Sequence, residues 1–514
     1  MKLSVLIKTL SGIVTDKRYA DADPEVTALC YDSRRVVPGA LFVAVAGFSV
    51  DGHRFIPDAV DRGAVAVVCG KPVQANVAVV QVSDPRAALA RLAVRFYFRP
   101  AEQMTLVGVT GTSGKTTVTY LLEGILEKAG YRPGVVGTIN YRYAGKVFDN
   151  PVTTPESADL QHIFRQMVNL GTTHAVMEVS SHALDLSRVD GCRFDLAVFT
   201  NLSHDHLDYH KDIEDYWRCK RRLFVEYLKP ADRRQAVRAV VNTDDPKGRL
   251  LAEMLGAAAL CSAAKGAGDI AIRQATRDLT GLRGIIRTPQ GDIEFNSPLV
   301  GDFNLDNILS ATGAALALGI APAAIAAGIH ASGCVPGRLE RIMEGGERFV
   351  FVDYSHKPDA LDNALGALRK LTRGRLITVF GCGGDRDSSK RPVMGEIAAR
   401  LSDLTVVTSD NPRSEDPLAI IDQVEAGVRK AGGQRIKIGE IQRSRQGSEY
   451  LVEPDRRSAI RLAIRAARKG DAVLIAGKGH ETYQILADRT IHFDDREVAR
   501  EILTDMQGTG GQLS

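Results

Sequence analysis

The segment Gly108-Val-Thr-Gly-Thr-Ser-Gly-Lys-Thr-Thr117 is a glycine-rich turn between an apolar run at 104–107 and a helix-like run at 118–128. A turn between a strand and a helix exposes backbone N–H groups, and the N-terminus of the helix adds the positive end of its dipole. Lys115 can reach terminal phosphates, and the Thr116 hydroxyl can bind Mg²⁺. Val109 stands where the strict Walker A pattern has its first glycine, so a plain tight turn is the alternative. We predict a binding site for a nucleoside triphosphate.

Length and composition indicate a soluble, cytoplasmic protein of about three domains. The chain has 514 residues, and a domain takes roughly 150. A net charge of +4, with 25% charged residues, predicts neither a nucleic-acid-binding face nor an acidic tail. Seven cysteines without CxxC spacing are typical of reduced thiols. The N-terminal apolar stretch is too short for a signal peptide, and no run reaches the roughly 18 apolar residues of a membrane span.

Short apolar segments alternate with helix-like segments, which favours parallel sheets with helices on both faces. The segments expected as strands are 41–45, 65–69, 77–82, 104–107, 174–179, 196–201, 239–242, 376–380, 404–408 and 472–475. Several end in polar loops, as in a doubly wound sheet that binds a ligand at its carboxyl edge. Breaks near Pro100 and Pro336 divide the chain into three expected domains, 1–100, 101–335 and 336–514. We predict an α/β fold.

Two segments after the glycine-rich turn carry side chains that can bind a metal ion. The first, 177–184, leaves a strand and would place Glu178 near the carboxyl edge of the sheet. The second, 201–210, holds three histidines and two aspartates in ten residues. Oxygen ligands suit Mg²⁺, whereas the histidines suit zinc as readily. The alternative is that these residues cap helices and bond loop backbone. We favour a metal or catalytic site.

Three further motifs have more than one interpretation. Lys220 lies in Arg218-Cys-Lys-Arg-Arg222, which by itself predicts a solvated basic helix face. Arg413 ends the turn Asp410-Asn-Pro-Arg413, where it is either surface decoration or a planar fork for a carboxylate. The glycines from Gly381 lack the full G-x-G-x-x-G run, so we do not expect NAD.

Six motifs occur in order along the chain: Gly111-Thr-Ser-Gly-Lys-Thr-Thr117, Glu178-Val-Ser-Ser-His182, Asn201-Leu-Ser with Asp205-His-Leu-Asp208, Gly301-Asp-Phe-Asn-Leu-Asp-Asn307, Gly337-Arg338 and Asp353-Tyr-Ser-His-Lys-Pro-Asp359. The set resembles the Mur ligase family, the ATP-dependent amide-forming enzymes of peptidoglycan precursor synthesis. Tyr31-Asp-Ser-Arg34 and Pro38-Gly-Ala-Leu-Phe-Val-Ala44 are similar to the UDP-binding domain of members that add the third residue. Asp410-Asn-Pro-Arg413 is similar to the signature of the branch that adds meso-diaminopimelate rather than L-lysine.

The resemblance implies a role for individual residues. As catalytic residues it implies Lys115, Glu178, His206 and Lys220. As ATP contacts it implies Gly111, Thr112, Ser113, Gly114, Lys115, Thr116, Thr117, Asn304, Arg338 and His356. As metal ligands it implies Thr116, Glu178, His206 and a carbamylated Lys220. As contacts of the UDP-sugar-peptide it implies Tyr31, Ser33, Phe48, Ser49, Val50, Thr153, Thr154, Ser180 and Arg188. As contacts of diaminopimelate it implies Arg386, Asp410, Asn411, Pro412, Arg413, Gly477 and Glu481.

The resemblance also implies the three-domain arrangement and the reaction. The N-terminal domain would bind UDP, the central domain would be a P-loop-type parallel-sheet ATPase, and the C-terminal domain would be Rossmann-like. A monomeric enzyme would use ATP, Mg²⁺ and a CO₂-derived carbamate on Lys220. It would add meso-2,6-diaminopimelate to UDP-N-acetylmuramoyl-L-alanyl-D-glutamate through an acyl phosphate, without nucleic acid or membrane as partner. The alternatives are the same ligase adding L-lysine, a folylpolyglutamate synthase-like ligase, and a nucleotide-gated regulatory protein.

Overall fold

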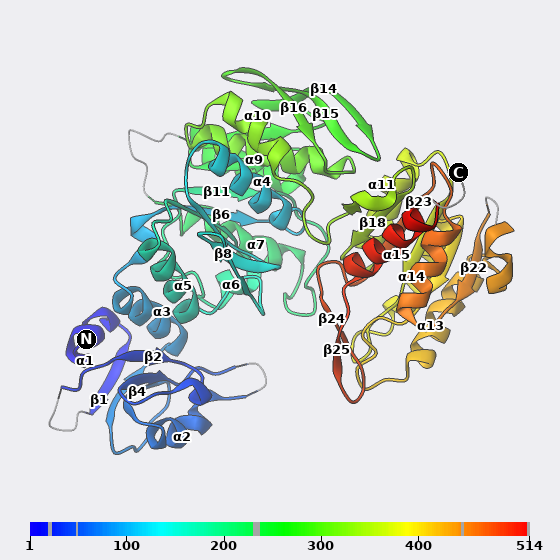
Figure 1. Cartoon of the computed structure of the whole chain (residues 1–514). Helices are drawn as coiled ribbons and strands as arrows, with labels where there is room; N and C mark the ends of the chain where they lie inside the picture. Colours follow the sequence, from blue (N-terminus) through cyan, green and yellow to red (C-terminus); the bar gives the residue numbers. More distant parts are fainter. Residues whose placement is uncertain (19–22, 48–49, 230–236, 444–446, 511–514) are drawn as a thin grey trace. The chain divides into compact units, whose positions relative to one another are not determined.

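The computed structural model describes residues 1–18, 23–47, 50–229, 237–443 and 447–510 (Figure 1). These residues form two compact units. Unit 1 comprises 1–272, 287–293 and 306–328, and unit 2 comprises 273–286, 294–305 and 329–514. Within the described ranges, no helix is long and apolar enough to cross a bilayer.

The N-terminal part of unit 1 is a five-stranded sheet with the order β1-β5-β4-β3-β2. The strands are β1 (Val14–Arg18), β2 (Ala28–Cys30), β3 (Ala40–Val43), β4 (Ala64–Cys69) and β5 (Ala78–Val82). All neighbours pair in parallel except β1 and β5. Helices α1 (Leu3–Ile7) and α3 (Pro85–Phe96) pack on one face, and α2 (Ile56–Asp61) packs on the other.

A mostly parallel sheet forms the centre of unit 1, with β8 antiparallel to both β7 and β9. From β13 to β9 its order is β13-β12-β11-β6-β10-β7-β8-β9. The strands are β6 (Thr105–Thr110), β7 (Pro133–Val136), β8 (Asn140–Tyr143), β9 (Lys146–Asp149), β10 (His174–Glu178), β11 (Leu196–Phe199), β12 (Ala239–Asn242) and β13 (Ala259–Ala263). Strands β6, β10 and β11 are buried along their length, as expected for parallel strands covered on both faces. The sheet continues past β13 into β14 (Ile270–Asp278), β15 (Gly281–Thr288) and β16 (Gly291–Ser297).

The helices of this region are α4 (Lys115–Lys128), α5 (Ser157–Asn169), α6 (Ser181–Asp185), α7 (Ile213–Val225), α8 (Pro246–Leu255), α9 (Phe303–Ala317) and α10 (Pro322–Ala331). Several begin at a side-chain cap. The Asp212 carboxylate accepts from the Asp215 N–H at the start of α7, and Asp245 caps α8 in the same way. Helix α4 begins at Lys115, three residues earlier than the apolar run of the sequence predicts, because Gly114 is its N-cap.

Unit 2 contains a seven-stranded sheet with the order β17-β18-β23-β19-β20-β22-β21. The strands are β17 (Glu340–Ile342), β18 (Phe349–Asp353), β19 (Leu376–Phe380), β20 (Leu404–Val407), β21 (Gln434–Arg435), β22 (Glu449–Val452) and β23 (Ala472–Ala476). Helices α11 (Pro358–Leu371), α12 (Lys390–Leu401) and α13 (Pro417–Lys430) share one core with this sheet. Helices α14 (Arg456–Ala466) and α15 (Asp495–Gly510) share the other. All pairs but β17–β18 are parallel, so this is a doubly wound sheet.

Each segment expected as a strand overlaps a strand of the structure. Two further strands, β24 (Tyr483–Ile485) and β25 (Thr490–His492), form an antiparallel hairpin after β23 that the sequence analysis did not predict. Residues 335–337, expected as a linker, are packed within unit 2, where Val335 is buried.

Candidate active site

The turn between β6 and α4 depends on two glycines. Gly111 has a φ of 150° and Gly114 a φ of 88°. A Cβ on Gly111 would lie 1.9 Å from Thr200 Oγ1, and a Cβ on Gly114 would lie 2.3 Å from Asn307 Oδ1. Glycine is required at both positions, because the backbone approaches its neighbours too closely for a side chain. The loop thus leads into the N-terminus of α4, where the backbone N–H groups of a first helical turn can bind an anion.

The segment that follows β11 holds this loop in place. The Asn201 carbonyl accepts from the Thr112 N–H at 2.9 Å, and Asn201 Oδ1 accepts from the Ser113 N–H at 2.9 Å. The Thr200 hydroxyl donates to the Ser113 carbonyl at 2.6 Å. The ends of two neighbouring strands, β6 and β11, therefore hold one loop at the carboxyl edge of the sheet.

Two lysines meet at the backbone of this loop. Lys115 Nζ donates to the carbonyls of Gly111 and Thr112, both at 2.9 Å. Lys220 Nζ donates to the Gly111 carbonyl at 2.8 Å and lies 4.5 Å from the ring centroid of Tyr216. Burial, and then the charge of Lys115, lower the pKa of Lys220 well below its usual value.

The interpretation of Lys220 as part of a solvated basic face, drawn from its local sequence, is wrong. Lys220 is 1% exposed. Its helix, α7, turns Tyr216, Leu223 and Lys220 toward the protein, whereas Arg218 is exposed. Residues at i, i+4 and i+7 share one face of a helix, so the lysine lies on the apolar face and its basic neighbours do not.

Glu178 is a buried carboxylate beside the loop. It ends β10, next to β6, and it is 1% exposed. Its Oε1 accepts from the Thr116 hydroxyl at 3.0 Å and from the Thr138 N–H at 2.9 Å, and its Oε2 accepts from the Thr138 hydroxyl at 2.9 Å. The structure therefore brings the predicted ligands Thr116 and Glu178 into direct contact.

His206 lies in an aromatic cluster beside Lys220. Its backbone has a φ of 55°, and its ring centroid lies 5.0 Å from that of His182 and 6.0 Å from that of Tyr216. The Tyr216 hydroxyl lies 3.3 Å from Thr112 Oγ1, which connects the cluster to the loop. Across the described ranges, no three His, Cys, Asp or Glu side chains converge as a metal site. Any metal site here needs oxygen atoms from Thr116, a modified Lys220 or a substrate.

The predicted contacts of the UDP-substrate fall into two groups in unit 1. Thr153 and Thr154 connect to Glu178, the former through Thr138 Oγ1 at 3.0 Å and the latter by a bond from its hydroxyl to the Glu178 carbonyl at 2.8 Å. Ser180 N donates to Thr154 Oγ1 at 3.2 Å, and Arg188 Nη1 donates to the Thr154 carbonyl at 3.1 Å. These residues form one continuous network with the phosphate loop.

The second group lies on the N-terminal sheet. The Tyr31 hydroxyl donates to the carboxylate of Asp159 on α5, and Ser33 is buried. Burial, with help from Asp159, raises the pKa of Tyr31. Val50 is exposed, and Phe48 and Ser49 lie outside the described residues.

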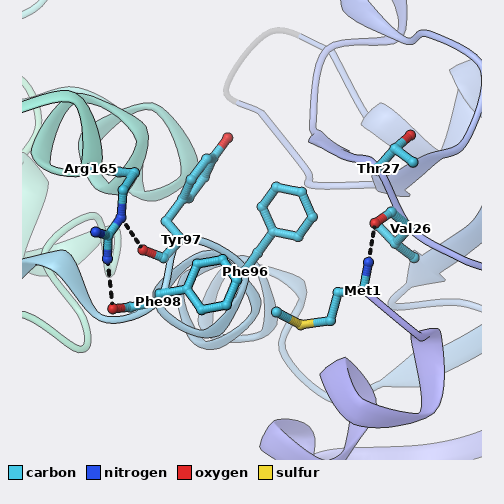
Figure 2. A pocket seen from close by; sticks show the side chains of 7 residues that line it. All are labelled: Met1, Val26, Thr27, Phe96, Tyr97, Phe98 and Arg165. Carbon is cyan, nitrogen blue, oxygen red and sulfur yellow. Dashed lines mark hydrogen bonds between the residues drawn. The ribbon is translucent and has the colours of Figure 1, made fainter. Parts of the chain in front are cut away.

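A cavity of about 430 Å³ lies where the N-terminal sheet meets α5, and Figure 2 shows the residues that line it. Arg165 spans its edge by donating to the carbonyls of Tyr97 and Phe98, both at 2.8 Å. The Met1 ammonium donates to the Val26 carbonyl at 2.9 Å. Its remaining lining residues are Thr27 and Phe96, so none of the predicted site residues borders it.

Three predicted ATP contacts belong to unit 2. Asn304 is buried, and its Nδ2 donates to the Val300 carbonyl at 2.8 Å. Arg338 lies with its guanidinium carbon 5.3 Å from the ring centroid of Tyr354, and the ring of His356 lies 4.5 Å from the same ring. Burial lowers the pKa of His356 to about 4, so the imidazole is neutral at pH 7. Arg338 and His356 therefore share one aromatic platform.

The predicted diaminopimelate contacts gather at the carboxyl ends of β19, β20 and β23 in unit 2. Asn411 Nδ2 donates to Glu481 Oε2 at 3.0 Å. Gly477 has a φ of 117°, and a Cβ there would lie 2.6 Å from Asp410 Oδ2. Arg413 has a φ of 52°, and its Nη1 donates to the Gly384 carbonyl at 2.8 Å.

Two other members of this set lie at the same edge. Pro412 is buried within the turn. Arg386 is exposed, and its Nη1 donates to the Asp385 carbonyl at 3.0 Å. The turn 410–413 is thus a packed element of the site, and Arg413 is anchored by backbone rather than free on the surface.

Three residues outside the predicted set hold it together. Asn201 fastens the phosphate loop, Thr138 binds both oxygens of Glu178, and Lys478 bonds both Asn411 and Glu481. Asn201 stands within a motif quoted above, so its position was a usable signal. Thr138 carries no such signal, because its role comes from the pairing of β7 with β10.

The glycine-rich loop between β6 and α4 is typical of a nucleotide-binding α/β protein. Three comparisons with known proteins place the chain in a more specific class. The models of three Mur ligase domains match the chain: "Mur ligase family, catalytic domain" at 25–97, "Mur ligase middle domain" at 109–315 and "Mur ligase, glutamate ligase domain" at 337–479. Together they cover most of the chain.

Curated relatives agree with these matches. A protein of Geobacter metallireducens is 47% identical over 95% of this chain and 96% of its own length. One of Gloeobacter violaceus is 48% identical over 95% of this chain and 96% of its own length. Both are named UDP-N-acetylmuramoyl-L-alanyl-D-glutamate–2,6-diaminopimelate ligase. A solved structure with that name is 31% identical, covers 99% of this chain and 100% of its own, and has a TM-score of 0.69.

This chain belongs to the Mur ligase family and is a ligase. These matches confirm the predicted α/β class with three domains. The central domain has the predicted P-loop-type sheet, and the C-terminal domain has the predicted Rossmann-like sheet.

Proposed function

We propose that this protein is an ATP-dependent ligase that joins meso-2,6-diaminopimelate to UDP-N-acetylmuramoyl-L-alanyl-D-glutamate. The observation that carries the ATP-dependent step is the loop built on Gly111 and Gly114, with Lys115 and Glu178 beside it. The substrate assignment is supported by the names of relatives that are 47% and 48% identical. The turn 410–413 supports it independently, because a partly buried cluster of amide, carboxylate and guanidinium groups suits an amino acid.

In the reaction, the γ-phosphoryl group of ATP passes to the side-chain carboxylate of the D-glutamate, which leaves ADP and an acyl phosphate. The amine of diaminopimelate then attacks the acyl carbon, and phosphate leaves as the amide forms. Lys115 neutralises charge on the transferred group, and the N–H groups of the loop orient it. Most of the rate enhancement comes from positioning the two substrates in line.

The residues near the loop fit a magnesium ion. The carboxylate of Glu178, the hydroxyl of Thr116 and the imidazole of His206 would hold it, together with phosphate oxygens. Bound there, the ion would neutralise charge on the phosphates. A carbamate on Lys220 would replace the ammonium with two oxygen atoms that share one negative charge and can bind a metal ion. The unprotonated amine that this requires is supported by burial of Lys220 and its lowered pKa.

A charge-neutral substitution tests the metal assignment. Glu178→Gln should raise the Mg²⁺ concentration needed for half-maximal activity at least tenfold, because it removes the anionic ligand and keeps the shape. Glu253→Gln, on the exposed side of α8, is the matched control and should leave that concentration unchanged. An unchanged Mg²⁺ dependence in Glu178→Gln would remove Glu178 from the proposed ligand set.

We assign the steps to the three parts of the chain. Residues 1–100 would bind the uridine nucleotide, 101–335 would bind ATP, and 336–514 would bind the amino acid. We also propose that the protein is cytoplasmic, since ATP and UDP-sugars are cytoplasmic metabolites, and that it is a monomer. Light scattering at assay concentration measures the mass, and a dimer would contradict that part.

ADP release from UDP-N-acetylmuramoyl-L-alanyl-D-glutamate and ATP, measured with a panel of amino acids, tests the whole assignment. We expect release with meso-diaminopimelate and at least about 10⁴-fold lower kcat/KM with L-lysine, because lysine leaves a charged donor unpaired. Equal turnover of the two would reject the diaminopimelate assignment. Release with a folate and glutamate would favour a folylpolyglutamate synthase. Nucleotide binding without phosphate release when all three substrates are present would favour a regulatory protein.

A further inference from the structure

Lys478 is a buried cation in the loop that follows β23. It lies in Gly477-Lys-Gly-His-Glu481, and its side chain is 0% exposed. Lysine is almost never fully buried unless its charge is paired. The surroundings of its ammonium group therefore indicate what it does.

The ammonium of Lys478 bonds three side chains of the proposed amino-acid site. Its Nζ lies 3.1 Å from Asn411 Oδ1, 3.1 Å from Glu481 Oε2 and 3.9 Å from Asp410 Oδ1. It also lies 5.4 Å from the ring centroid of Tyr483. One cation thus connects the end of β20 to the loop after β23.

These contacts fix the orientation of the Asn411 carboxamide. Its Oδ1 accepts from both Lys478 Nζ and the Ile485 N–H, the latter at 3.0 Å, so Nδ2 must face Glu481. Glu481 Oε2 accepts from Lys478 and from Asn411. In the described part of the chain no hydrogen bond occupies Glu481 Oε1, which remains available to a ligand.

Among Lys478, Asp410 and Glu481, the charges add to a single negative charge. Asp410 and Glu481 each contribute one carboxylate, and Lys478 offsets one of them. Without Lys478, the carboxylates of Asp410 and Glu481 would lose the cation between them, and Asn411 Oδ1 would keep one donor, the Ile485 N–H, instead of two.

We propose that Lys478 is a positioning residue that helps to orient Asn411 and Glu481. Its charge leaves one net negative charge on the group it forms with Asp410 and Glu481, matched to one ammonium group of the incoming amino acid. This inference rests on the proposed function, because it takes the incoming ligand to be an amino acid. Lys478 itself does not touch the reacting atoms in this proposal.

A second buried cation of the same sheet supplies a matched control. Arg375 precedes β19 and pairs with Asp471, which precedes β23, with Nη2 to Oδ2 at 2.8 Å and both side chains 6% exposed. This pair lies at the amino ends of β19 and β23, whereas Lys478 follows the carboxyl end of β23. Arg375→Met therefore removes a buried cation from the same sheet without touching the proposed site.

The experiment compares Lys478→Met and Arg375→Met with the wild type in KM for each of the three substrates and in melting temperature. Lys478→Met should raise the KM for meso-diaminopimelate at least tenfold, while the KM for ATP stays within about twofold. Arg375→Met should lower the melting temperature and leave all three KM values near the wild-type ones. If Lys478→Met does not fold, Lys478→Gln keeps an N–H donor without the charge, and it should raise the same KM.

Two results would overturn the inference. One is a KM for diaminopimelate in the Lys478 variants that stays within twofold of the wild-type value. The other is a rise in that KM in Arg375→Met as large as the rise in Lys478→Met. Failure of the proposed function is distinguishable, because the wild type itself would then release no ADP with any amino acid.

Discussion

Lys220 Nζ donates to the carbonyl oxygen of Gly111 at 2.8 Å, so a fully buried lysine contacts the backbone of the phosphate loop. Lys115 donates to the same carbonyl at 2.9 Å. Two ammonium groups cannot share one acceptor in a buried site without cost, and burial together with Lys115 lowers the pKa of Lys220 well below its usual value. A lowered pKa favours the unprotonated amine, which is the form that can react with CO₂.

We expect activity to depend on CO₂ through Lys220. Enzyme assayed in CO₂-depleted buffer should lose activity and regain it with bicarbonate, and ¹³C-bicarbonate should give a carbamate signal in the NMR spectrum. Lys220→Met should lose at least about a hundredfold in kcat and show no signal. Lys211→Met, at an exposed position just before α7, should behave as the wild type. Full activity in Lys220→Met would contradict the proposal.

The two ends of α4 allow the close packing of the phosphate loop to be tested. Gly114 and Gly130 have nearly the same φ, 88° and 84°, but a Cβ meets Asn307 at 2.3 Å only at Gly114, whereas nothing lies within 4 Å at Gly130. Gly130→Ala should lower the free energy of unfolding by about 1 kcal/mol through backbone strain alone. Gly114→Ala should lower the free energy of unfolding by more than Gly130→Ala does. It should also weaken ATP binding at least tenfold in calorimetric titrations. Equal ATP affinities would show that the loop tolerates a side chain.

Arg413 is expected to set the choice between diaminopimelate and lysine. Its Nη1 is held by the Gly384 carbonyl at 2.8 Å, so the rest of the guanidinium can bind the distal carboxylate of the ligand bidentately. Arg413→Ala should lower kcat/KM for meso-diaminopimelate at least about a hundredfold and change it little for L-lysine. Arg400→Ala, which removes an exposed ion pair with Asp362, is the control. Unchanged selectivity in Arg413→Ala would assign the discrimination to other residues.

Unit 2 should lose stability in mild acid. Burial lowers the pKa values of His356 and His480 to about 4, compared with 6.5 for an unperturbed histidine. Between these values the unfolded state binds more protons than the folded state, so stability increases with pH from about 4 to 6.5 and is lost as the pH falls. Urea unfolding followed across that range should show this slope, and His356→Gln with His480→Gln should reduce it. A slope that is unchanged in the double variant would contradict the assignment.

Local sequence patterns were sufficient for the strand–loop–helix at 104–128 and for the ten strand segments, because each depends on neighbours along the chain. The order of motifs was sufficient for the family. Lys220 shows the limit of such patterns: its flanking residues are basic, and only the packing of α7 against β6 places its side chain inside the protein. Thr138 and Lys478 escaped for the same reason. Each acts through a partner 40 to 70 residues away in the sequence. Such residues come into contact only because parallel strands bring their carboxyl ends to one edge of the sheet.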